Sequence, residues 1–206
     1  MAMDKRIEKT IKNLEKNNIK CFFVEKKEDV IPLLSTFIHE HDTVSVGGSV
    51  TLSQLGIIDY LRSLNINFLD RYAEDLSSED LKEIFRKSFF ADIYITGTNA
   101  ICEDGTLFNV DGRGNRVAAM IYGPDKVIVI AGVNKIVKDL DEAIERVKNH
   151  AAPLNSKRLE LNTPCQITGK CIDCESKNRI CRYYVTIKKP QPNRFIMILV
   201  NDTLGY

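Results

Sequence analysis

The stretch KVIVIAGVNK, residues 126–135, decides the fold of this chain. Its first six residues are the most apolar strand candidate in the sequence. Gly132 ends this run, and a helical pattern follows that we expect to extend to about Asn149. A short apolar strand that runs through glycine into a helix is typical of a parallel sheet covered by helices.

The same order recurs along the chain. Apolar runs at 43–46 and 91–96 also end in glycine and small polar residues, and a helix is expected over 51–64. Strands that alternate with helices indicate a mostly parallel sheet with both faces covered. A hairpin is expected over 100–110, because an Asp-Gly pair separates two apolar segments there. We therefore predict an α/β fold, a three-layer α/β/α sandwich around a mostly parallel mixed sheet.

Composition limits the class of protein. The 206 residues are 44% hydrophobic, which is enough for one domain, 1–206, that needs no disulfides. Lys and Arg number 29 and Asp and Glu 28, so a basic surface for nucleic acid is not indicated. No apolar run reaches the ~18 residues of a membrane span. Residues 1–6 precede no apolar stretch of a signal peptide, so we expect a cytoplasmic protein.

Small and polar residues follow three of the expected strands. In open parallel sheets, ligands bind beyond the carboxyl ends of the strands, where glycine lets backbone amides approach an anion. Tight turns alone would also explain these glycines. The ligand-binding residues expected from these loops are Gly47, Gly48, Ser49 and Thr51, then Gly97, Thr98 and Asn99, and finally Gly132 and Lys135.

The segment 111–116, DGRGNR, adds charge beside these loops. Gly114, Asn115 and Arg116 join the expected ligand-binding set, because Arg116 can fork onto a carboxylate or phosphate. Lys135 is expected in the first turn of its helix, where a cation is disfavoured unless an anion is bound. A solvated polar turn and a surface lysine are the alternatives. The predicted ligand is a small anionic metabolite.

Catalytic candidates are few. Glu103 and Asp111 lie beside the loops and are candidate general bases if burial raises their pKa. Asp104 belongs to the hairpin turn, where Asp is common. The sequence contains no recognisable Ser/His/Asp arrangement, so it leaves open whether the protein catalyses a reaction.

The six cysteines divide into two groups. Cys21 and Cys102 lie in apolar segments and are expected to be core residues. The other four fall within a segment of changed character, 153–193, which we interpret as a Cys-rich metal-binding insertion before the last strand. The predicted ligands are Cys165, Cys171, Cys174 and Cys181.

The spacing C-x5-C-x2-C-x6-C leaves the metal open. Zinc usually takes two close pairs of ligands, whereas this segment has one. An iron–sulfur cluster tolerates single outer cysteines, and the spacing approaches the plant-type pattern with one residue more. We expect an iron–sulfur cluster, [4Fe–4S] in type, with zinc as the alternative. Unligated reduced thiols are the third reading.

Between residues 43 and 137 the chain resembles the lactate-utilisation (LUD) domain family. The residues that match are VGGS at 46–49, ITGTNA at 95–100, DGT at 104–106, GNR at 114–116, GP at 123–124 and GVNKIV at 132–137; the segment NDTLG at 201–205 agrees.

This resemblance implies a fold similar to phosphosugar isomerases and CoA transferases, with a site at the loops named above. It also implies a link to bacterial lactate oxidation, in which related components work with iron–sulfur redox partner proteins. The first functional hypothesis is thus a redox-linked LUD protein that binds a small anionic ligand and one metal centre. An isomerase or acyl-transfer enzyme with structural zinc and a non-catalytic metabolite-sensing module are the alternatives.

Overall fold

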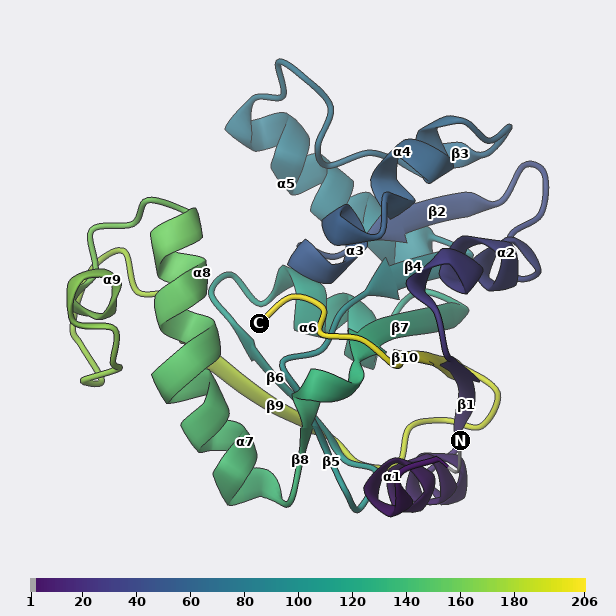
Figure 1. Ribbon diagram of the computed structural model, residues 1–206. Helices are drawn as coiled ribbons and strands as arrows, with labels where there is room; N and C mark the ends of the chain where they lie inside the picture. The colour runs from purple at the N-terminus through teal and green to yellow at the C-terminus, as the bar shows by residue number, and fades with distance from the viewer. Residues whose placement is uncertain (1–2) are drawn as a thin grey trace.

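The computed structural model describes residues 3–206, which form two β-sheets flanked by helices (Figure 1). All six strands of the large sheet run parallel. In spatial order they are β1 (Ile19–Val24), β10 (Phe195–Val200), β7 (Lys126–Gly132), β4 (Ile93–Thr96), β2 (Thr43–Val46) and β3 (Asn67–Leu69).

Strand β7 lies inside the large sheet, and its side chains are buried on both faces. Ile128 and Ile130 point into one core, whereas Val127 and Val129 point into the other, because successive side chains of a strand alternate. β10 repeats this division. Burial on both faces explains why these strands are continuous apolar runs and lack a polar alternation. The predicted α/β fold is confirmed.

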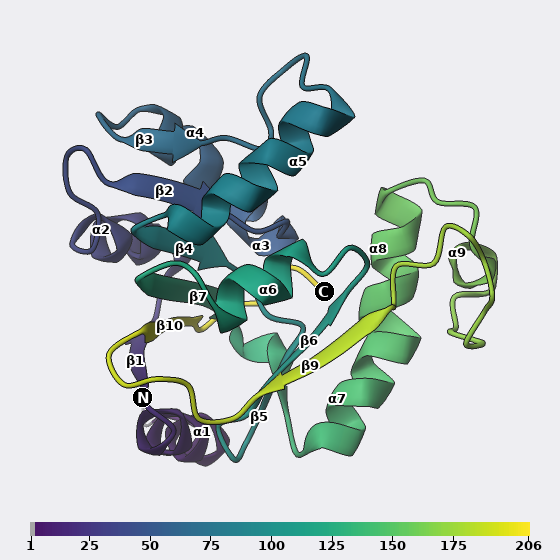
Figure 2. The same cartoon turned by 180° about the vertical axis from the view of Figure 1, so that it is seen from behind.

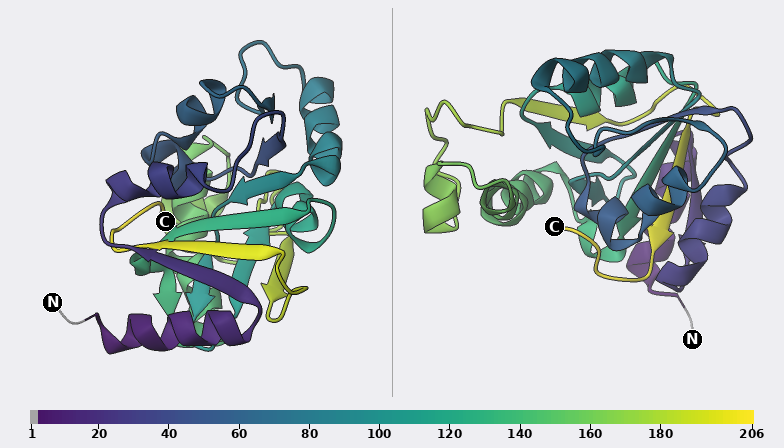
Figure 3. Two further views of the ribbon diagram at one scale, coloured as in Figure 1. Left: turned by 90° about the vertical axis from the view of Figure 1, so that its right-hand side faces the viewer. Right: turned by 90° about the horizontal axis from the view of Figure 1, so that it is seen from above.

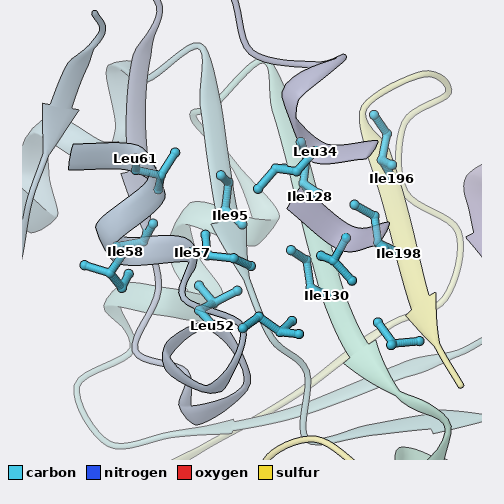
Figure 4. Close-up of a cluster of buried hydrophobic side chains, with 14 of the residues drawn as sticks. Leu34, Leu52, Ile57, Ile58, Leu61, Ile95, Ile128, Ile130, Ile196 and Ile198 are labelled. Atoms are coloured by element: carbon cyan, nitrogen blue, oxygen red, sulfur yellow. The ribbon is translucent and has the colours of Figure 1, made fainter. Parts of the chain in front are cut away.

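One face of the large sheet is covered by α2 (Val30–Ser35), α3 (Val50–Gln54) and α4 (Ile57–Arg62). Figure 4 shows their leucines and isoleucines packed on β4, β7 and β10. The single helix expected over 51–64 is divided at Gly56, whose φ of +66° ends α3. Glycine adopts this left-handed conformation without steric cost, so the chain changes direction there.

The antiparallel hairpin belongs to a second, smaller sheet instead of a single mixed sheet. Its strands, in spatial order, are β8 (Ile136–Val137), β5 (Ala100–Cys102), β6 (Leu107–Asp111) and β9 (Tyr183–Ile187). Together with α1 (Lys5–Lys16) and α6 (Asn115–Ile121), this sheet covers the other face of the large sheet. Figure 2 shows β9 crossing below α6 on that side.

A helical rod covers the outer face of the small sheet. It consists of α7 (Leu140–Arg146), a π-helical turn (Val147–Ala151) and α8 (Ala152–Arg158). The helix expected directly after Gly132 was wrong at its start: a 3₁₀ turn (Val133–Lys135) and β8 come first, and Asp139 caps α7. The rod also continues beyond Asn149, where the sequence predicts its end. Pro153 does not interrupt it, because this proline stands in the first turn of α8, where its missing N–H matters least.

The insertion expected over 153–193 is not a separate unit. Its first residues extend the rod, and its last ones form β9 of the small sheet. Between them lie α9 (Pro164–Thr168) and a coil. Both views, Figures 1 and 2, show this segment on the outer side of the rod.

The remaining elements complete the large-sheet side. They are the 3₁₀ turn Lys27–Asp29, α5 (Ser78–Lys87) and the 3₁₀ turn Ser88–Phe90. α5 begins with a capping box between Ser77 and Asp80, as the Ser-x-x-acid pattern favours. Figure 3 shows α1 alongside β1, at one edge of the large sheet, and the rod apart from that sheet. Within residues 3–206, helices are too short or too polar to cross a membrane.

Candidate functional site

A pocket of about 380 Å³ lies at the carboxyl ends of the large-sheet strands. The segments that follow five of the six strands, all but β1, contribute to it, as expected for parallel strands, whose carboxyl ends meet at one edge. The rod, the segment after β6 and the C-terminal tail form the remaining walls. The lining residues from strand ends and tail are Gly48, Ser49, Val50, Thr51, Arg71, Gly97, Thr98, Asn99, Lys135, Gly205 and Tyr206.

Most of the residues expected from the sequence are thus brought together, but Gly47, Gly114 and Gly132 do not line the pocket. A Cβ on Gly132 would collide with the Asp202 carbonyl and lie 2.8 Å from the Leu204 nitrogen. A Cβ on Gly47 would collide with the Thr96 side chain. These two glycines therefore permit close packing, and Gly114 has the positive φ of +82° that starts α6.

Arg116 is 7% exposed, and every donor of its guanidinium is engaged by the protein. Nε donates to Asp111 Oδ1 at 3.2 Å. The two Nη groups donate to the Asn109 and Asn99 side chains at 2.6 and 2.9 Å and to two backbone carbonyls. The expected fork of Arg116 onto a ligand is therefore not available in this arrangement; Arg116 holds the pocket loops together.

Neither expected general base is a free carboxylate of the pocket. Asp111 lines the pocket, but it accepts from the backbone N–H groups of Arg116 and Val117 at 3.1 and 3.3 Å and from Arg116 Nε. Glu103 lies against α1, where Lys9 Nζ and Arg6 Nε donate to it at 2.8 Å. Hydrogen bonding to Lys9 lowers the pKa of Glu103, opposite to the change that a general base needs.

Lys135 is the most enclosed cation of the pocket. Its side chain leaves the 3₁₀ turn after β7, is 4% exposed, and donates from Nζ to Thr51 Oγ1 at 3.1 Å. Among residues 3–206, no carboxylate pairs with it. Burial, and then the charges of Arg146 and Arg116, lower the pKa of Lys135 to about 7.

Arg71 is a pocket residue that the sequence interpretation missed. Its guanidinium lies 4.8 Å from the Phe85 ring centroid, and its buried Nε has no hydrogen-bond partner in the described chain. Nη1 is 3.4 Å from where a Cβ on Gly48 would be, so this glycine leaves room for the arginine. Arg71 follows β3 closely, and the rule for strand ends would have identified it.

Arg113, from the charged segment 111–116, also lines the pocket, and Arg158 and Tyr206 line it without any sign in the sequence. Arg158 donates to the Tyr206 hydroxyl at 2.8 Å and to Asn155, so it faces no acid in the described chain. No sequence spacing connects these residues, because tertiary packing alone places them together. The lining thus contains five basic residues and one acid, Asp111, which is already paired with Arg116.

The four clustered cysteines line one small cavity of about 10 Å³ beside the pocket. Cys165 and Cys181 are buried, and Cys171 and Cys174 are partly exposed. The Asp173 amide donates to Cys171 Sγ at 3.4 Å. Arg179 fixes the loop, since it donates to the carbonyls of Cys181 and Cys174 at 2.7 and 2.9 Å.

The thiols are close enough to influence one another. Burial, and then the neighbouring Cys171 and Cys165, raise the pKa of Cys181 to about 11. Even so, the part of the chain that the structure describes contains no group of three or more His, Cys, Asp or Glu side chains arranged to hold a metal ion. Cys102 is buried, and Cys21 packs against the core on β1.

The cysteine cavity and the pocket share a wall. Ile180 and Cys181 line both. The Arg182 amide donates to the Asp111 carbonyl at 3.0 Å, and a Cβ on Gly112 would lie 3.2 Å from Ile180 Cα. The cysteine loop is therefore joined directly to the segment after β6 that lines the pocket.

A family model described as the LUD domain matches residues 7–200. The structure of a DUF162 family protein from Deinococcus radiodurans is similar, with a TM-score of 0.55 at 15% identity, over 97% of this chain and 99% of that one. Ribose 5-phosphate isomerase A from Methanocaldococcus jannaschii gives a TM-score of 0.36 at 19% identity, over 56% of each chain. No curated protein matches the sequence. The Deinococcus protein shares the fold over nearly the whole chain.

Proposed function

The chain belongs to the LUD domain family, and on that premise we propose that its pocket binds a small anionic metabolite, a carboxylate or a phosphate ester. The observation that supports this most is the excess of positive charge. Arg71, Lys135 and Arg158 line the pocket without an acidic partner in the described chain. Lys135 is buried and Arg71 is half-buried, whereas Arg158 is exposed. An enclosed cation costs free energy unless an opposite charge accompanies it, and a bound anion supplies that charge.

The experiment is a thermal-shift screen followed by calorimetry. Lactate, pyruvate, ribose 5-phosphate, pyrophosphate, CoA and nucleotides are tested, because a ligand that binds the folded state raises the melting temperature. Arg71→Met should weaken the best ligand at least tenfold, as expected for the loss of a charge-assisted contact. Arg86→Met is the matched control, since Arg86 lies on α5 and does not line the pocket. Absence of a shift with every anion would reject the proposal.

We further propose that Cys165, Cys171, Cys174 and Cys181 hold one metal centre, an iron–sulfur cluster of the [4Fe–4S] type, with zinc as the alternative. The donor set supports this, because four thiols around one cavity match the ligand number of either group. The Asp173 amide at Cys171 Sγ is the kind of hydrogen bond that stabilises a ligating thiolate. A cluster would supply one-electron chemistry beside the pocket, whereas zinc would only fix the loop.

Anaerobic purification, absorption spectroscopy and metal analysis test the centre. Brown protein with about four iron atoms and four sulfides per chain supports the cluster. Colourless protein with one zinc supports the alternative, and metal-free protein rejects both. Cys171→Ser should remove the metal, and Cys21→Ser should not, because Cys21 packs against the core.

The redox-linked role rests on the shared wall at Ile180 and Cys181. We propose that the metabolite and the centre act together in a process related to lactate utilisation, with iron–sulfur proteins as electron partners. The reduction potential of the loaded protein should then change when the best anion is added. If the reduction potential stays unchanged at a saturating concentration of that anion, the pocket and the metal centre do not act together, and the redox-linked role is rejected.

A further inference from the structure

The amine of Lys135 differs from the other cations of the pocket. The four arginines of the pocket are permanently charged, so they cannot react as nucleophiles; all but the engaged Arg116 can hold an anion. Lys135 ends in a primary amine, lies in the same pocket and is nearly enclosed by protein. A lysine in such surroundings is the usual nucleophile for a carbonyl compound.

The contacts of Lys135 leave its nitrogen available. Its hydrogen-bond partner is the Thr51 hydroxyl at 3.1 Å, and in the described chain no carboxylate stands within ion-pair distance to keep the ammonium form. Glycine at 205 leaves the space beside the amine open, since a Cβ there would lie 3.3 Å from Nζ. The nitrogen therefore lies at the pocket wall beside a single neutral hydroxyl.

The charged groups that face Lys135 favour its uncharged form. Arg146 comes from the rod, where its Nη1 donates to the Asn99 carbonyl at 2.8 Å, and Arg116 comes from α6. The acid of the pocket, Asp111, is paired with Arg116 at 3.2 Å. With burial, these charges give Lys135 a pKa of about 7, so a large fraction of the amine carries a free electron pair at neutral pH.

We propose that Lys135 forms a reversible imine with anions that also contain an aldehyde or ketone, so that the ligand class is a carbonyl-bearing carboxylate or phosphate ester. This inference rests on the proposed anion binding, and it narrows the metabolite class. The arginines would hold the anionic group while the carbonyl carbon meets Nζ. Holding both partners in one pocket raises their effective concentration.

The reaction balances without an oxidant or a reductant. The electron pair of Nζ attacks the carbonyl carbon, a C–N bond forms, and the oxygen takes a proton to give a carbinolamine. The C–O bond then breaks, and the oxygen leaves as water with two hydrogens that came from the amine. Thr51 Oγ1, at 3.1 Å from Nζ, is placed to pass a proton between nitrogen and oxygen.

Reductive trapping tests the proposal. The purified protein is mixed with glyoxylate, pyruvate or pyridoxal 5′-phosphate, reduced with borohydride, and examined by intact mass and peptide mapping. The first two probes carry a carboxylate and the third a phosphate, so the arms distinguish the anionic group. We expect one adduct per chain on Lys135 with at least one probe, formed at least tenfold faster than adducts on exposed lysines.

Matched variants separate reactivity from folding. Lys135→Met removes the amine from an unbranched side chain that is one atom shorter, and it should lower the adduct yield at least tenfold. Lys138→Met, on an exposed lysine nearby, should leave the yield unchanged. The trapping rate should rise to half of its maximum near pH 7, because only the uncharged amine reacts. Adducts spread over exposed lysines, or none at Lys135, would overturn the proposal.

Pyrophosphate binding is measured on the same preparation, since pyrophosphate has no carbonyl. If pyrophosphate binds and no adduct forms, the imine is rejected and anion binding stands. If neither occurs, the proposed function fails together with this inference. Thr51→Val should slow trapping, because it removes the hydroxyl at 3.1 Å from Nζ, whereas Lys138→Met should not.

Discussion

Arg116 shows how a side chain can be essential to a pocket without being free to bind its ligand. Its five N–H donors meet Asp111, two asparagine side chains and two carbonyls. These acceptors come from the loop after β4 and from β6, so one guanidinium holds two loops at fixed separation. Lysine has a single point of attachment and cannot replace this fork.

Replacement of Arg116 by Met should lower the free energy of unfolding by about 3 kcal/mol. The Asp111 carboxylate keeps two backbone N–H donors but loses its opposite charge, and the buried Asn109 amide oxygen loses its donor. Urea denaturation measures the change. Arg113→Met is the control and should change stability by less than ~0.5 kcal/mol, since Arg113 is exposed. If the two replacements lower stability equally, the hydrogen bonds of the Arg116 guanidinium do not account for the loss.

Lys135 makes stability depend on pH. Its pKa is lowered from 10.5 to about 7 in the folded protein, so between these values the unfolded chain binds a proton that the folded chain does not. Stability attributable to Lys135 therefore rises with pH from about 7 to 10.5, by up to ~1.4 kcal/mol per unit. Below pH 7 the buried Lys135 is charged in the folded protein, and the full free-energy cost of burying this charge remains.

Urea denaturation of the wild type and of Lys135→Met at pH 6.5, 8 and 9 isolates this contribution. The advantage of the variant should be largest at pH 6.5 and should shrink as the pH rises. A difference that stays constant over this interval would show that Lys135 keeps its proton after folding.

At the scale of elements, the tail after β10 is pressed onto the end of β7. Gly132 allows this approach, because a Cβ there would meet the backbone of Asp202 and Leu204. Backbone atoms cannot move aside as a flexible side chain can. The tail in turn brings Gly205 and Tyr206 to the pocket.

Gly132→Ala should therefore destabilise the protein by about 2 kcal/mol or more and also weaken anion binding. Gly48→Ala is the comparison: its Cβ would lie 3.4 Å from the mobile end of Arg71, so the loss of stability should be below ~1 kcal/mol. Thermal unfolding and calorimetry measure both effects. Similar melting temperatures for the two variants would contradict the packing explanation.

Elements of this fold differ in how well the sequence predicts them. β7 and β10 are buried on both faces, so their apolar runs identify them directly. β9 escapes notice because most of its side chains are exposed, including Tyr183 and Tyr184, which leaves no burial pattern. Its pairing with β6 is a tertiary event that local sequence does not encode.

The pocket residues also differ in how well the sequence predicts them. Loops directly after parallel strands are predictable, because such strand ends share one edge of the sheet. The rod and the tail add Arg158 and Tyr206 through long-range packing, and the pattern of residues gives no sign of it. The roles of Arg116 and Glu103 were misread for a related reason: their ion-pair partners, Asp111 and Arg6 with Lys9, decide what each charge can do.

At the scale of the whole molecule, three bodies meet at the pocket: the large sheet, the segment after β6 on the small sheet, and the rod. A ligand that contacts all three stabilises their mutual arrangement as well as its own loops. Hydrogen exchange with and without pyrophosphate should therefore show slower exchange in 147–161 and 201–206. α1 does not line the pocket and should exchange unchanged. Protection confined to 48–51 would show that the ligand touches the large sheet alone.

The place of β10 in the large sheet has a consequence for how the protein is made. β10 lies between β1 and β7, and β1 pairs with β10 alone. While the ribosome is still adding residues before 195, β1 has no neighbour, and one edge of β7 is open. The nascent chain must keep these apolar edges from pairing with other chains until β10 emerges. A sheet whose middle strand is synthesised last therefore exposes apolar strand edges for longer than one built in sequence order.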